Sequence, residues 1–87
     1  MIYKVKLETL ENAKIFVYQC SKFHEDIDYS VGRYRIDAKS ILGILSTDLR
    51  KEALVEFHSN DTNIIYRFEC LIDQFRTDLG EYKIYKH

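Results

Sequence analysis

Carboxylate side chains occur in two close groups that suggest metal binding or acid–base chemistry. Glu25 directly precedes Asp26, and Asp48 lies shortly before Glu52. Neighbouring carboxylates can bind a hard cation or take part in general acid–base catalysis. Both groups lie at the ends of predicted elements and among lysines and arginines, so we interpret them as solvated surface charge. The sequence therefore predicts no metal site and no catalytic residue.

The cysteines and the composition exclude further classes of function. Cys20 and Cys70 form neither a disulfide framework nor a pair with zinc-ligand spacing, so no cofactor is expected. The 13 basic and 14 acidic residues give a formal net charge of -1, which provides no basic stripe for nucleic acid. No apolar run is long enough to cross a bilayer and no signal-peptide core opens the sequence. We expect a cytoplasmic protein that binds neither nucleic acid nor membrane.

The elements that must position any functional residue follow from the spacing of the apolar residues. Alternating apolar and polar residues predict strands at residues 3–7, 27–31, 34–36 and 53–57. Apolar residues at three-and-four spacing predict a helix over residues 10–23 and two more in the second half of the chain. Thr9, Ser40 and either Asn60 or Asp61 stand where helix N-caps belong. The predicted fold is α+β, with four antiparallel strands and three helices on one face in the order βαββαβα.

Nothing in the sequence suggests a second domain, since it has no repeats, no proline and no linker. We expect residues 1–79 to form one domain and residues 80–87 to be a C-terminal extension. Its alternation of apolar and charged residues fits either an added edge strand or a frayed end. The expected oligomeric state is a monomer or a weak homodimer.

Two stretches resemble the HPr phosphocarrier family of the bacterial sugar phosphotransferase system. They are Ser21-Lys22-Phe23 with Asp26-Ile27, and Asp37-Ala38-Lys39-Ser40-Ile41-Leu42-Gly43-Ile44-Leu45-Ser46. The family has methionine where Leu42 and Leu45 stand, and otherwise the second stretch follows its pattern. The resemblance covers about residues 2–76 and implies the HPr-like open-faced sandwich, whose element order is the one predicted above.

The resemblance also implies a phosphate-carrying histidine at the start of the first helix, in a Gly-Leu-His-Ala-Arg-Pro-Ala motif. The ungapped alignment places Thr9 at the histidine, Glu11 at the arginine and Asn12 at the proline, and Ala13 alone matches. An imidazole accepts and releases a phosphoryl group near neutral pH, whereas a threonine ester is a far poorer donor. Glu11 would repel the phosphate that an arginine attracts. We therefore expect a degenerate phosphocarrier site at Thr9, Glu11 and Asn12.

The three histidines offer no evident replacement. His24 follows the first predicted helix, His58 lies near the end of the fourth predicted strand, and His87 ends the chain. None stands at a helix start, where backbone N–H groups favour a phosphate. The alternative to a lost activity is a functional phosphocarrier in phosphoenolpyruvate-dependent sugar uptake with a relocated phosphosite.

The best-matched stretch contains two further candidates. The resemblance implies regulatory phosphorylation of Ser40 by a dedicated kinase, as in Gram-positive members, with Arg35 and Lys39 near enough in sequence to assist. Ser40 is equally explained as an N-cap worth about 1 kcal/mol. Ile41, Leu42 and Leu45 could bind a partner, or part of this group could belong to the core.

These observations predict a regulatory or protein-binding member of the family that is not an enzyme. Its expected partner is another protein. This partner could be a component of the phosphotransferase system or of catabolite regulation, or it could be an unrelated protein. A structural module without a signalling role is the remaining alternative.

Overall fold

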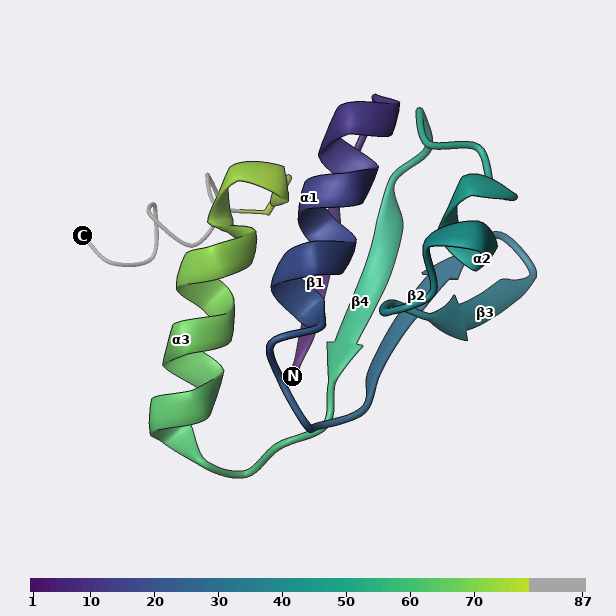
Figure 1. Ribbon diagram of the computed structural model, residues 1–87. Coiled ribbons are helices and arrows are strands. Elements are labelled where there is room, and N and C mark those ends of the chain that lie inside the picture. The colour runs from purple at the N-terminus through teal and green to yellow at the C-terminus, as the bar shows by residue number, and fades with distance from the viewer. Residues whose placement is uncertain (79–87) are drawn as a thin grey trace.

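The computed structural model describes residues 1–78, which form one antiparallel sheet and three α-helices (Figure 1). The strands are β1 (Ile2–Val5), β2 (Ile27–Val31), β3 (Tyr34–Asp37) and β4 (Ala53–Phe57). The helices are α1 (Leu10–Cys20), α2 (Ile41–Leu45) and α3 (Thr62–Ile72), with a short 3-10 helix, η1 (Asp73–Phe75), after α3. This order confirms the predicted α+β open-faced sandwich, while the predicted extension at residues 80–87 lies outside the described residues. None of the described helices has the length and apolar character needed to span a bilayer.

The strands lie in the order β1-β4-β2-β3, so β1 forms one edge of the sheet and β3 the other. The end of the described chain lies beside β1, because Thr77 and Asp78 bond Lys4. Alternate strand residues face α1 and α3 and are buried: Tyr3, Val5, Ile27, Tyr29, Val31, Ala53, Val55 and Phe57. Aromatic rings connect sheet and helices, since Phe57 of β4 stacks on Phe68 of α3 with a centroid distance of 4.2 Å. The core therefore lies between one face of the sheet and its helices.

Two element boundaries differ from the sequence prediction. α1 ends at Cys20 rather than near residue 23, because the N–H of Phe23 donates to the Cys20 carbonyl at 3.2 Å in a tighter turn. Phe23 is nevertheless buried, as its apolar spacing indicated. β1 likewise ends at Val5, and Leu7 is buried beyond the strand. The periodicity therefore identified Leu7 and Phe23 correctly as inward-facing, although both residues lie in turns and not in a strand or helix.

The segment after α3 returns along the outer edge of β1. The Lys6 N–H donates to the Phe75 carbonyl at 2.9 Å, and the Thr77 N–H donates to the Lys4 carbonyl at 2.9 Å. The Lys4 N–H donates to a carboxylate oxygen of Asp78 at 3.2 Å. These three bonds satisfy outward-facing backbone groups of β1 that would otherwise form an open sheet edge.

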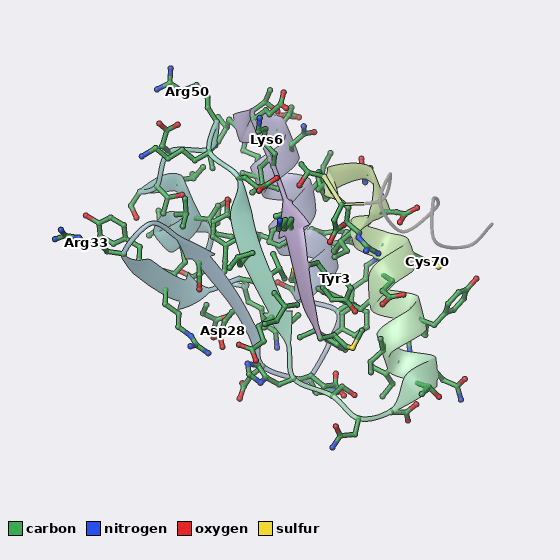
Figure 2. All side chains as sticks on the ribbon, turned by 180° about the vertical axis from the view of Figure 1, so that it is seen from behind. Tyr3, Lys6, Asp28, Arg33, Arg50 and Cys70 are labelled. Atoms are coloured by element: carbon green, nitrogen blue, oxygen red, sulfur yellow. The ribbon has the colours of Figure 1, made fainter. Side chains whose placement is uncertain are left out.

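The other face of the sheet carries no helix among the described residues (Figure 2). Asp28 of β2 lies on this open face, which is turned toward the viewer in Figure 2. The register places Asp28 between Asp37 of β3 and Glu56 of β4. Strand alternation thus collects carboxylates on the open face.

Candidate functional site

The chain reaches α1 through a tight and strained turn. Glu8 has a φ of 73°, in the left-handed region that residues with a Cβ rarely adopt. The Thr9 N–H donates to the Leu7 carbonyl at 2.9 Å across it, which makes Leu7, Glu8 and Thr9 a γ-turn of the positive-φ form. The Glu8 N–H donates to the Leu49 carbonyl at 2.8 Å and so ties this turn to the segment after α2. These two hydrogen bonds therefore hold the backbone in place where helix α1 begins.

The predicted phosphocarrier positions form the N-terminal cap of α1. The Thr9 hydroxyl accepts a hydrogen bond from the Asn12 N–H at 3.1 Å, the N-cap bond that satisfies one free donor of the first turn. The Asn12 side-chain amide donates to the Leu7 carbonyl at 2.8 Å. A proline at residue 12 could form neither bond, because it has no N–H and no side-chain amide. Thr9 and Asn12 are therefore a matched pair that holds the start of the helix.

Glu11, the third of these positions, lies exposed in the first turn of α1. Its carboxylate stabilises the positive end of the helix dipole. The structure thus places Thr9, Glu11 and Asn12 at the N-terminal end of α1.

Both described histidines lie at the opposite end of the molecule. His24 follows the C-terminal end of α1, and a helix of 11 residues is about 16 Å long. The His58 N–H donates to the Asp26 carbonyl at 3.1 Å, which places His58 at that same end. Within residues 1–78, no imidazole lies beside the start of α1.

The start of α2 keeps its family-like residues in an ordered cap. The Ser40 hydroxyl accepts a hydrogen bond from the Gly43 N–H at 3.2 Å, and the Ser40 side chain is exposed. A Cβ on Gly43 would lie 3.2 Å from the Ser40 oxygen, a close contact that glycine avoids. The expectation that Arg35 assists Ser40 was wrong, because the Arg35 guanidinium is bonded to Asp28 on the open face at 2.6 Å.

The apolar residues of α2 divide between core and surface. Ile44 is buried, and Ile41 packs partly buried against the core. Leu42 is 79% exposed and Leu45 is 37% exposed, although both are leucines on a helix that contacts α1 and β3. Of the three predicted partner-binding residues, Leu42 and Leu45 therefore present apolar surface, and Ile41 mainly supports the helix.

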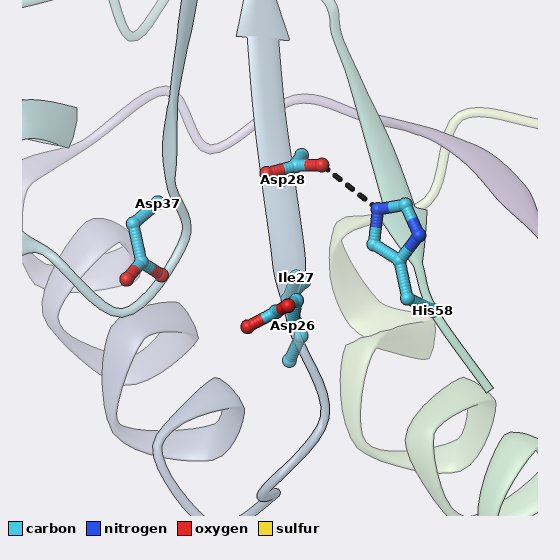
Figure 3. Close-up of a pocket in the computed structure, with 5 residues that line it drawn as sticks. All are labelled: Asp26, Ile27, Asp28, Asp37 and His58. Carbon is cyan, nitrogen blue, oxygen red and sulfur yellow. Dashed lines mark hydrogen bonds and ion pairs between the residues drawn. The ribbon is translucent and has the colours of Figure 1, made fainter.

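A second group of chemically active side chains lies on the open face. The Arg35 guanidinium contacts the carboxylates of Asp28 at 2.6 Å and Glu56 at 3.4 Å. His58 Nε2 lies 2.8 Å from the same Asp28 oxygen (Figure 3). Hydrogen bonds from Arg35 and then His58 hold the pKa of Asp28 below its ordinary value. Beside these groups a shallow hollow is lined by Asp26, Ile27, Asp28, Asp37 and His58.

Sequence reasoning missed this open-face group. The sequence pattern predicts Asp26 to be solvated surface charge, and it suggests for His58 only a possible role as a phosphate carrier. The available signal was alternation: Asp28 in β2 and Glu56 in β4 lie between buried apolar residues. Their pairing, however, depends on a register that the sequence alone does not specify.

Comparison with known families and structures adds an independent finding. The model of the family described as "PTS HPr component phosphorylation site" matches residues 9–65. None of the curated proteins matches the chain.

Solved structures of three bacterial proteins are similar to the chain. HPr-C-His from Thermoanaerobacter tengcongensis has 21% identity and a TM-score of 0.67, over 84% of this chain and 91% of that one. A phosphocarrier protein HPr from Bacillus anthracis has 22% identity and a TM-score of 0.65, over 86% and 95%. The histidine-containing phosphocarrier protein of Mycoplasma has 15% identity and a TM-score of 0.64, over 83% and 91%. At such identities these likenesses show the fold.

Proposed function

The chain belongs to the HPr family of the phosphotransferase system, and from this membership we propose that it has lost phosphohistidine transfer and acts as a regulatory, protein-binding module. Proteins of this family carry phosphate rather than catalyse a reaction, and they work by contacting other proteins of the system. In this proposal the chain still contacts other proteins but no longer carries a phosphoryl group.

One observation carries the proposal: the positions that the resemblance assigns to phosphate transfer form a hydrogen-bonded cap of α1. Thr9 accepts from the Asn12 N–H, and the Asn12 amide reaches back to the Leu7 carbonyl. A mere loss of the histidine would leave the proline in place. The replacement of both residues gives the helix start a hydrogen-bonded cap, and Glu11 adds a charge that favours this cap and disfavours phosphate.

The α2 surface supports the retained half of the proposal. Leu42 and Leu45 leave apolar area exposed next to Ser40, which is itself exposed. Apolar patches with a polar rim are typical of protein-binding sites. A phosphate on Ser40 would add about two negative charges beside this patch and would change partner affinity without unfolding the domain. Ser40 would therefore be the switch, and Leu42 and Leu45 the contact surface.

Two phosphorylation reactions test the proposal directly. The full chain is incubated with labelled phosphoenolpyruvate and the general phosphotransferase enzyme, and a conventional HPr in a parallel reaction confirms that the enzyme is active. We expect no acid-labile label on this chain. Acid-labile label would contradict the proposal and support the relocated phosphosite, which His24→Asn, His58→Asn and His87→Asn would then locate.

The second reaction uses ATP and an HPr kinase. Acid-stable label is expected on wild type and absent from Ser40→Ala. Label that persists in Ser40→Ala would refute Ser40 as the switch. No label on wild type would leave protein binding through Leu42 and Leu45 without a phosphorylation switch, and would contradict the regulatory half of the proposal.

A further inference from the structure

The open face brings a mixed set of metal-binding atoms together from two paired strands. Asp28 and Glu56 are direct partners across β2 and β4, and His58 lies two residues beyond Glu56, on the same side. One carboxylate oxygen from each of Asp28 and Glu56 and one ring nitrogen of His58 all lie within 4.8 Å of one another. The set combines an imidazole nitrogen with two carboxylate oxygens and is thus more specific than a group of carboxylates.

The separations of these atoms fit a tetrahedral ion. Two ligands about 2.1 Å from a tetrahedral zinc lie about 3.4 Å from each other. His58 Nε2 is 2.8 Å from the Asp28 oxygen and 4.0 Å from the Glu56 oxygen, so the observed separations bracket that value. Small rotations of partly exposed side chains would equalise them, and water would complete the coordination as in open zinc sites.

The position between the two carboxylates already holds a positive group. Arg35 Nη2 lies 2.6 Å from Asp28 Oδ2 and 3.4 Å from Glu56 Oε1, the same two oxygens that His58 Nε2 approaches. The Arg35 side chain is 62% exposed and comes from β3, at the side of the sheet. It can therefore move into solvent when another cation binds.

The neighbouring hollow adds negative charge without adding a basic group. Asp26 and Asp37 line it together with Asp28 and His58 (Figure 3). With Glu56, four carboxylates and one guanidinium surround the His58 imidazole. This field attracts a divalent cation and opposes the approach of a phosphate to His58.

From this geometry we propose that Asp28, Glu56 and His58 form a binding site for a divalent transition metal of the zinc class. The metal binds the lone pair of Nε2 in the neutral His58 tautomer whose proton is on Nδ1, so any proton on Nε2 beyond that one is released to solvent. Arg35 is the resident cation that the metal displaces. Magnesium and calcium prefer oxygen ligands alone, so the imidazole favours zinc over both. The site is separate from α1 and α2 and does not depend on the function proposed above.

The test is a calorimetric titration of the full chain with zinc chloride in a non-chelating buffer. All variants carry Cys70→Ser, because Cys70 is an exposed thiol that could bind zinc elsewhere. We expect one equivalent to bind, with affinity lowered at least about tenfold in His58→Ala, since even residues that only support a ligand often change metal affinity by 10 to 100-fold. His24→Ala removes an exposed histidine elsewhere and is expected to bind zinc as the parent does.

Arg35→Gln gives a prediction of opposite sign. Removing the competing guanidinium is expected to tighten zinc binding, whereas a site that merely needed the intact open face would weaken. Imidazole NMR signals of His58 are expected to shift on zinc addition and to stay unchanged with magnesium. Equal zinc affinity in the Cys70→Ser parent and in its His58→Ala derivative, or weaker binding in the Arg35→Gln derivative, would overturn the proposal.

Discussion

The starts of α1 and α2 are both capped by a hydroxyl residue, yet they differ in what the sequence preserves. At α1 the Thr9 cap pairs with Asn12, and the sequence departs from the motif that the resemblance leads us to expect there. At α2 the Ser40 cap pairs with Gly43, and the family-like stretch continues through Leu45. Capping alone is met by serine or threonine, so it explains neither the replaced residues of α1 nor the exposed leucines of α2. The function proposed above interprets this difference as a separation of protein contact from phosphoryl transfer.

The strongest challenge to this comparison is to rebuild the transfer site. In Thr9→His/Glu11→Arg/Asn12→Pro, we expect phosphoenolpyruvate-dependent, acid-labile labelling to rise from background by several orders of magnitude, because imidazole and guanidinium return to a helix N-terminus. The measurement is label per chain after incubation with the general phosphotransferase enzyme. Thr9→His alone serves as the control and should label less, since Glu11 stays in place. If the wild-type chain were labelled as strongly as the triple variant, the start of α1 would still support phosphoryl transfer and the two helix starts would not differ in the way proposed.

The next largest effect concerns the contact surface of α2. Leu42→Asp should lower the kcat/KM for phosphorylation of Ser40 by an HPr kinase by about 30-fold, the size of a loss of about 2 kcal/mol at an interface hot spot. Leu54→Asp is a matched control, because Leu54 is 45% exposed on the open face of the sheet. Similar losses in both variants would mean that the exposed part of α2 is not the contact surface.

A smaller effect compares the two caps as stabilising devices. Thr9→Ala and Ser40→Ala should each lower the free energy of unfolding by about 1 kcal/mol. Thr9→Ala should cost more, since α1 spans 11 residues and α2 only 5. Urea unfolding monitored by circular dichroism measures both. If Ser40→Ala were stabilising, Ser40 would be retained at a cost in stability, and its role as a cap would no longer explain it.

The smallest effect concerns the strained turn before α1. Glu8→Gly should raise the free energy of unfolding by about 0.5 kcal/mol, because relief of the positive φ exceeds the added entropy of the unfolded chain. The same urea titration detects it. Glu8→Ala keeps the Cβ and therefore should bring no gain. Destabilisation by Glu8→Gly would show that the Glu8 side chain, and not the backbone, holds the turn.

Local patterns predicted most of this fold because each element buries one face. The alternation in β4 and the spacing in α1 identified Val55 and Phe16 as inward-facing, and both are fully buried. The positions of Thr9 and Ser40 as caps were also predictable, since capping is a local interaction. These features require no knowledge of distant contacts.

Features that depend on distant contacts could not be predicted in this way. The open-face set arises because Asp28 and Glu56 become partners across strands that are far apart in the sequence. The turn at Glu8 is held by a bond to the Leu49 carbonyl, and glutamate carries no local signal for a positive φ. Arg35 was assigned to Ser40 by proximity in sequence, although strand alternation directs its side chain to the opposite face.

The hydrogen bonds along the outer edge of β1 limit how copies of this protein can polymerise. The outward N–H and carbonyl of Lys4 bond Asp78 and Thr77, and the Lys6 N–H bonds Phe75, so a foreign strand cannot pair with β1 along these residues. In the described part of the chain, a second copy could extend the sheet only beside β3. Two copies joined in that way would each turn a closed edge outward, and growth would end with the pair instead of continuing into a fibre.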